Sequence, residues 1–179
     1  MTECTQSSFT FAPHFSRDVV ARFDGGQITT EAGALLLRPV EQRTGILRQF
    51  AACFRDHRRA DLVEHSISEL VRQRVYGIAL GYEDLNDHDQ LRQDPFVALL
   101  SGKRDVEGEH RRRKQDRGKA GAGKSTLNRL ELTPADAQPD ARYKKIVMDE
   151  AAVDSLLVDL YIQAQERQPK RIVLDLDAT

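Results

Sequence analysis

Residues 172–179 read Ile172-Val173-Leu174-Asp175-Leu176-Asp177-Ala178-Thr179, and they constrain the fold class more than any other run in the chain. Four aliphatic residues in so short a stretch predict a strand that is buried on both faces. A buried carboxylate is costly unless it is paired, hydrogen-bonded or bound to a metal. Because side chains at i and i+2 of a strand point to the same face, Asp175 and Asp177 could form a divalent-cation site at the carboxyl edge of a sheet.

Two classes of enzyme use an aliphatic strand that ends in this way. The haloacid dehalogenase superfamily has an apolar run followed by D-x-D-x-[TV], which Asp175 to Thr179 satisfies, and there the first Asp is the nucleophile and the second the general acid/base. In DDE transposases an Asp on the first strand binds metal, and two Mg²⁺ ions about 4 Å apart activate water or a DNA 3′-hydroxyl. The third alternative is a strand that simply ends in solvated aspartates. The strand alone leaves all three open.

The overall composition is that of a globular protein without an obvious partner. A chain of 179 residues suffices for one domain, or for a small domain plus part of another. Its net charge is −1, so only the distribution of charge is informative. No apolar run approaches the roughly 18–20 residues that cross a bilayer, and the polar N-terminus lacks the features of a secretory signal. Two distant cysteines fit a reducing compartment, so we expect a cytoplasmic protein.

The hydrophobic periodicity predicts a mostly helical body before the terminal strand. Strand-like runs are expected at 19–23 and 27–29, around the turn signal Asp24-Gly25-Gly26. Asp61 and Glu64 have the spacing of a capping box, which predicts a long helix from about Asp61 to Leu80 that ends at Gly81. The other helices are expected at 30–37 before a break at Pro39, at 46–54, at 84–100 with a split near Asp94-Pro95, at 125–132 and at 149–165.

Residues 101–123 lose this periodicity and are rich in Arg, Lys and Gly, which predicts an exposed loop. Between Arg104 and Arg129 there are nine basic and four acidic residues, a net charge of +5 within a nearly neutral chain. Flexible basic loops suit sequence-independent, salt-dependent contact with DNA phosphates, and a solvated loop without a partner is the alternative. The candidate DNA-binding residues are Arg111, Arg112, Arg113, Lys114, Arg117, Lys119, Lys124 and Arg129.

Residues 118–125 match the phosphate-loop pattern G-x-x-x-x-G-K-[ST] letter for letter. A phosphate loop requires a buried strand before it, so that backbone N–H groups turn toward the phosphates at the start of a helix. The highly basic residues 111–117 cannot form such a strand, so nucleotide hydrolysis is not expected. The five histidines show no partners at metal-ligand spacing, and His65 is expected at the surface or boundary of the long helix.

Segments upstream of the terminal strand distinguish between the enzyme classes. The most telling are Leu80-Gly81-Tyr82-Glu83-Asp84-Leu85-Asn86-Asp87-His88-Asp89 and Ala122-Gly123-Lys124-Ser125-Thr126-Leu127-Asn128-Arg129-Leu130-Glu131, together with Phe23-Asp24-Gly25-Gly26 and Thr30-Glu31-Ala32-Gly33. In this order they resemble the N-terminal region of insertion-sequence DDE transposases, in particular the family usually numbered thirteen-eighty. The resemblance extends over nearly the whole chain.

This resemblance implies a fold class and a division of the chain. The fold expected is a mainly α N-terminal region that leads into the first strand of a truncated RNase H-like α/β catalytic domain. Residues 1–133 would be the DNA-associating region with its basic loop at about 103–123, residues 134–148 a linker, and residues 149–179 the helix and first strand of the catalytic domain.

The resemblance also implies an activity, which is the nicking of element ends and the joining of 3′-hydroxyls to target DNA. Asp177 would be the first catalytic and metal-binding acid, with Asp175 as the runner-up or a neighbour, and the cation would be Mg²⁺ or Mn²⁺. The full-length enzyme would act on DNA as a homo-oligomer in the bacterial cytoplasm, associated with the nucleoid. The alternatives are a fragment of a haloacid-dehalogenase-like phosphatase and a non-catalytic DNA-binding remnant of a mobile element.

The 179-residue polypeptide is expected not to cleave DNA by itself. The resemblance places the second Asp and the Glu of the triad after Thr179, and a single strand cannot hold two metal ions. Incubation of the purified polypeptide with supercoiled plasmid and Mg²⁺ or Mn²⁺ should leave the plasmid intact on a gel. Metal-dependent nicking would contradict this expectation.

Overall fold

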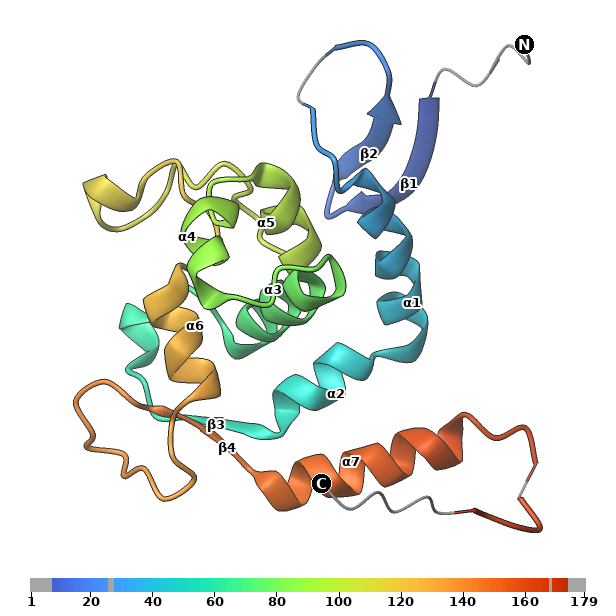
Figure 1. Ribbon diagram of the computed structural model, residues 1–179. Helices are drawn as coiled ribbons and strands as arrows, with labels where there is room; N and C mark the ends of the chain where they lie inside the picture. Colours follow the sequence, from blue (N-terminus) through green and yellow to red (C-terminus); the bar gives the residue numbers. More distant parts are fainter. Residues whose placement is uncertain (1–7, 26–27, 168, 174–179) are drawn as a thin grey trace.

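The computed structural model describes residues 8–25, 28–167 and 169–173 (Figure 1). This part of the chain is mixed α/β, with a helical body and two small antiparallel sheets of two strands each. Residues 174–179, which hold most of the predicted terminal strand, lie outside the described residues. Within the described part, no helix combines the length and the apolar character that crossing a membrane would require.

An N-terminal hairpin precedes the helical body (Figure 1). Strand β1 (Ser8–His14) pairs antiparallel with β2 (Arg17–Arg22). The predicted strand at 19–23 is thus largely confirmed, but its expected partner is wrong. Residues 28 and 29 form no strand, because the strand that pairs with β2 comes before it and the tight turn falls at Phe15, which has a φ of 54°.

Two helices follow the hairpin and lead into the body. A 3₁₀ turn (Ala32–Leu36) continues directly into α1 (Leu37–Thr44), and α2 (Ile46–Ala52) begins after Gly45, whose φ of +63° turns the chain. The prediction that Pro39 would kink or end a helix is wrong. Pro39 is the third residue of α1, in the first turn, where a backbone N–H has no intrahelical acceptor to lose.

The long central helix is α3 (Ile67–Ala79). Its capping box is formed by Ser66 and Glu69, whereas Asp61 lies in a separate 3₁₀ turn (Ala60–Leu62). The predicted start at Asp61 is therefore wrong, because two segments fit the capping pattern and only the second begins the helix. The predicted end is confirmed, since Gly81 follows Leu80 with a φ of +91°.

Three further helices pack around α3. A 3₁₀ turn (Leu85–Asp87) runs into α4 (His88–Leu91), and α5 (Pro95–Ser101) starts after Asp94, whose carboxylate caps it. The predicted split near Asp94-Pro95 is thus confirmed. Helix α6 (Lys124–Glu131) also matches its predicted position to within one residue at each end.

A second sheet joins distant parts of the chain. Strand β3 (Phe54–Asp56) pairs antiparallel with β4 (Ile146–Met148), and α7 (Glu150–Gln163) follows with Asp149 as its N-cap. The predicted helix through residue 54 is too long, and β4 lies within the residues 134–148 that were expected to link two domains. Phe54 belongs to β3, and residues 146–148 form β4, in which Ile146 and Val147 are buried.

The hydrophobic core centres on α3. Leu70 and Val71 pack with Leu127 and Leu130 of α6 and with Ile146 of β4. A second cluster includes Tyr76, the hairpin residue Val19, Ala34, Leu35 and Leu100. Helix α3 also carries a buried polar residue, Gln73, whose position decides how the chain after α5 packs.

The side-chain amide of Gln73 binds the backbone of Ala122 at both its polar groups. The N–H of Ala122 donates to Gln73 Oε1 at 2.8 Å, and Gln73 Nε2 donates to the carbonyl oxygen of Ala122 at 2.7 Å. Gln73 is only 1% exposed, so no water can replace these bonds. The segment before α6 is therefore fixed on α3.

Gln73→Ala should lower the free energy of unfolding by about 2–4 kcal/mol. The substitution leaves the buried N–H and carbonyl of Ala122 unpaired and creates a cavity. Gln138→Ala removes a glutamine amide from an exposed position in the segment after α6 and should change stability by less than about 0.5 kcal/mol. Urea denaturation of both variants tests this, and equal midpoints would contradict the proposed role of Gln73.

Candidate nucleic-acid interface

The two predicted catalytic acids, Asp175 and Asp177, lie outside the described residues. The described start of the predicted strand, Ile172 and Val173, is exposed and forms no strand. Across residues 8–25, 28–167 and 169–173, no group of three or more His, Cys, Asp or Glu side chains is arranged to hold a metal ion. The candidate nucleic-acid interface within these residues is therefore the basic region.

The basic loop (residues 103–123) was predicted to be exposed, and this is only partly correct. It contains one 3₁₀ turn (Lys114–Asp116) and otherwise irregular backbone. Its two ends are buried at Lys103 and at residues 120–122. The correction has a physical reason, because hydrogen bonds from the body satisfy the backbone of these ends and exclude water.

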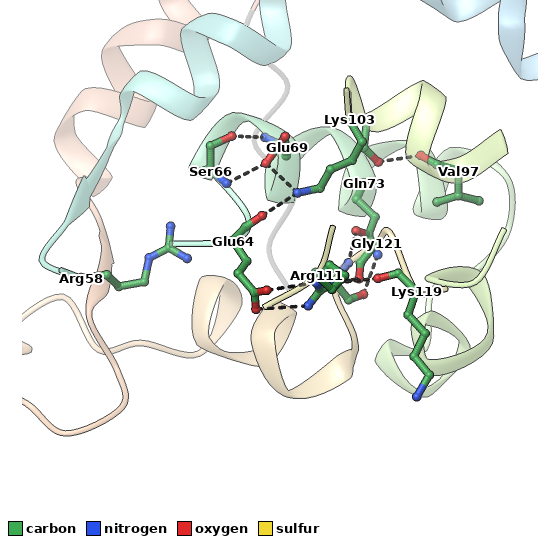
Figure 2. A network of polar contacts seen from close by, with 12 residues as sticks. Arg58, Glu64, Ser66, Glu69, Gln73, Val97, Lys103, Arg111, Lys119 and Gly121 are labelled. Atoms are coloured by element: carbon green, nitrogen blue, oxygen red, sulfur yellow. Dashed lines mark hydrogen bonds and ion pairs between the residues drawn. The ribbon is translucent and has the colours of Figure 1, made fainter. Parts of the chain in front are cut away.

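Arg111 belongs to the interior of this loop. Its side chain is 14% exposed, and Nε and Nη2 lie 3.3 and 3.4 Å from the carboxylate oxygens of Glu64. Its Nη1 donates to the carbonyl oxygens of Lys119 and Gly121. Figure 2 shows Arg111 between Glu64 and the segment from Lys119 to Gly121, where the loop returns to the body. Arg111 thus holds the loop closed, because its guanidinium is bound to Glu64 and to two backbone carbonyl oxygens.

Glu64 is the acidic partner of Arg111. It also accepts a hydrogen bond from the backbone N–H of Arg112 at 2.9 Å. Although partial burial opposes ionisation, the bonds from Arg112 and Arg111 hold the pKa of Glu64 below its usual value. The carboxylate is therefore ionised and continues to orient the loop throughout the neutral range.

Lys103 fixes the other end of the loop. Its ammonium group donates to Glu69 Oε2 at 2.9 Å and to the carbonyl oxygen of Glu64 at 2.8 Å (Figure 2). Burial lowers the pKa of Lys103, and the carboxylate of Glu69 opposes that shift. The carbonyl of Lys103 in turn lies 2.6 Å from Nε2 of His14 in the hairpin. This lysine is thus a structural cation.

Four other cations of the loop face solvent. Arg112, Arg113, Lys114 and Arg117 are exposed, and within the described part of the chain none of their side chains forms an ion pair. Lys119 is half-buried, and its Nζ donates to the carbonyl of Gln115 at 2.9 Å. A rigid base with outward cations suits contact with a polyanion, because less side-chain and backbone order is lost on binding.

The phosphate-loop pattern at residues 118–125 has a structural explanation. An irregular segment precedes it where a nucleotide-binding fold needs a strand, as expected from the sequence. A Cβ at Gly123 would lie 2.9 Å from Asp89 Oδ1 and from Nη1 of Arg92, and Gly118 has a φ of +79°. The first glycine of the pattern thus makes a left-handed turn, and the second allows a close contact with α4.

Lys124 and Arg129, the last two predicted DNA-binding residues, lie on α6 and not on the loop. Nζ of Lys124 lies 3.0 Å from Asn86 Oδ1 and 3.6 Å from Asp89 Oδ2. The guanidinium of Arg129 lies 5.6 Å from the ring centroid of Tyr143. Both residues line an open cleft beside α6 that the sequence did not indicate.

His65, expected at a surface or boundary of the long helix, lies before that helix and is 6% exposed. Its Nδ1 is buried without a hydrogen-bond partner. Burial, reinforced by the nearby charges of Lys103 and Arg111, lowers the pKa of His65 from 6.5 to about 2. His65 is therefore a neutral, buried side chain at neutral pH.

The basic region thus combines a well-packed base with outward cations. Comparison with known protein families identifies the family of this chain. The sequence profile of the family described as "Transposase DDE domain group 1" matches residues 11–179. The chain belongs to this family of DDE transposases, and its function is of the transposase type.

Comparison with curated proteins gave no match, and comparison with solved structures gave none either. The family assignment therefore rests on the profile. It bears out the resemblance to DDE transposases. Finer assignments, including the family number and the role of each acid, go beyond it.

Unfolding should become easier as the pH falls below about 6.5. The unfolded state takes up a proton at His65 below this pH while the folded state does not, so the free energy of unfolding falls by up to about 1.4 kcal/mol per pH unit. Burial also lowers the pKa values of His14 and His88, which adds to the same slope.

Urea denaturation between about pH 5 and 6.5 reports mainly on these histidines, because most carboxylates titrate at lower pH. His65→Gln should flatten the pH dependence relative to the unmodified protein. An unaltered slope in the His65 variant would contradict the assignment.

Proposed function

We propose that this chain is the N-terminal, DNA-associating part of a DDE transposase that moves an insertion sequence by metal-dependent strand nicking and joining. The observation that carries the proposal is the family match over residues 11–179. The ordered resemblance of the segments around Gly81 and Lys124 supports the more specific assignment to the insertion-sequence family usually numbered thirteen-eighty.

DNA is held through the outward face of the basic loop. Arg112, Arg113, Lys114 and Arg117 supply the contacts to phosphates, and their release of counterions makes binding salt-dependent. Arg111 acts through the loop and not on DNA, because its guanidinium is already bound to Glu64 and to two carbonyl oxygens. Lys119, Lys124 and Arg129 are secondary contacts, since each already has a partner within the fold.

Asp177 is the first catalytic acid in this proposal, with Asp175 as its neighbour or alternative. Together they would belong to an RNase H-like catalytic domain and hold Mg²⁺ or Mn²⁺. When bound, the cation would activate the attacking hydroxyl and stabilise the leaving oxygen. The full-length enzyme would act as a homo-oligomer on paired element ends, in the cytoplasm and associated with the nucleoid.

Replacing all four outward cations, Arg112, Arg113, Lys114 and Arg117, with alanine should weaken binding to duplex DNA by about tenfold or more. The slope of log affinity against log salt should become less steep by about 3.6, because each of the four lost phosphate contacts contributes about 0.9. Fluorescence anisotropy with a labelled duplex at several salt concentrations measures both quantities.

The matched control replaces four exposed arginines elsewhere, Arg17, Arg22, Arg43 and Arg48, and so changes the net charge by the same amount. It should retain most of the affinity and the salt slope. Equal losses in the two variants would show that net charge alone attracts DNA, and unchanged affinity in the loop variant would refute the proposed interface.

A further inference from the structure

An open cleft of about 570 Å³ lies beside α6, outside the basic loop. One wall is the face of α6, and the other combines the 3₁₀ turn before α4 with the irregular segment between α6 and β4. Its lining residues are Asp84, Leu85, Asn86, Lys124, Ser125, Asn128, Arg129, Tyr143 and Lys144. The volume is within the range that holds one small organic ligand or one nucleotide.

The most distinctive feature of this cleft is the ring of Tyr143, which is 57% exposed. Two guanidinium groups lie against it, Arg142 at 4.9 Å and Arg129 at 5.6 Å from the ring centroid. Neither arginine forms an ion pair within the described residues. An exposed aromatic ring flanked by unpaired arginines is the arrangement on which nucleic-acid bases stack, with the cations close to the adjoining phosphates.

The charges and polar groups of the cleft favour the same ligand. Lys124 is paired with Asp89 outside the lining. Arg129 and Lys144 outweigh the single lining acid, Asp84, which is already bound to the backbone and side chain of Asn86. Ser125, Asn128 and Arg129 lie at helical spacing on one face of α6. The hydroxyl of Ser125 and the amide of Asn128 offer donors and acceptors for the edge of a base.

We infer that this cleft binds an unpaired nucleotide of a DNA strand, with its base stacked on Tyr143 and its flanking phosphates held by Arg129 and Arg142. A base that stacks on the ring displaces one guanidinium, which becomes free to reach a phosphate. A base within a duplex is already stacked on its neighbours and cannot enter. The inference rests on the proposed function and adds to it a second contact, specific for single strands.

Tyr143→Ala should weaken binding of a short single-stranded oligonucleotide by about fivefold to a hundredfold. Duplex affinity, set by the basic loop, should change by less than about twofold. Tyr143→Phe keeps the stacking ring and should bind the single strand as the unmodified protein does. The thermal midpoints of both variants should match the unmodified protein, because the side chain is largely exposed.

An oligonucleotide of the same length that lacks its bases provides a second test. The unmodified protein should bind it as weakly as Tyr143→Ala binds the normal strand, and the variant should lose nothing further when the bases are removed. Such non-additivity identifies the base as the partner of the ring. Fully additive losses, or a single-strand affinity that Tyr143→Ala leaves unchanged, would overturn the inference.

The basic-loop variant separates this inference from the proposed function. If the loop variant loses duplex binding while Tyr143→Ala binds single strands normally, the inference fails and the proposed function stands. If the unmodified protein binds neither form of DNA, both fail. Single-strand binding that survives the loop variant but not Tyr143→Ala would establish two independent contacts.

Discussion

The pairing of the Gln73 amide with the backbone of Ala122 is the constraint on which the rest of the arrangement depends. It satisfies a buried N–H and a buried carbonyl at the point where an irregular segment enters the core. Because that point is fixed, α6 packs on α3 and the basic loop returns to the body at a defined place. The close approach of Gly121 to Arg92 completes the junction.

The basic loop shows how one cluster of like charges can serve two purposes. Lys103 and Arg111 point inward and are neutralised by Glu69 and Glu64, so their burial does not leave an unpaired charge. The exposed cations keep their hydration until a polyanion replaces it. The inner ion pairs stabilise the conformation of the loop, and the exposed residues supply the positive charge that a partner would contact.

Most helices of the body are predicted from the sequence, but the long-range contacts that hold them together are not. The split before α5, the start of α6 and the glycine after α3 follow from local chemistry, namely a proline after a capping aspartate, apolar spacing and a left-handed turn. The β3–β4 sheet and the Gln73–Ala122 pairing depend on residues far apart in sequence, so no local pattern reveals them. Arg111 was grouped with DNA-binding residues because composition does not distinguish an inward arginine from an outward one. Tyr143 was missed because the cleft around it forms only when α6 and the following segment are in place.

The β3–β4 sheet has a consequence for the order in which the chain is synthesised. Helices α3 to α6 lie in sequence between Asp56 and its partner Ile146. Helices α1 to α6 can begin to pack while the ribosome is still adding later residues, but β3 must wait for its partner as an uncovered strand edge. A nascent chain that pauses before β4 thus presents a pairing edge to its neighbours. Pairing with β4 covers this edge of β3 and closes the small sheet.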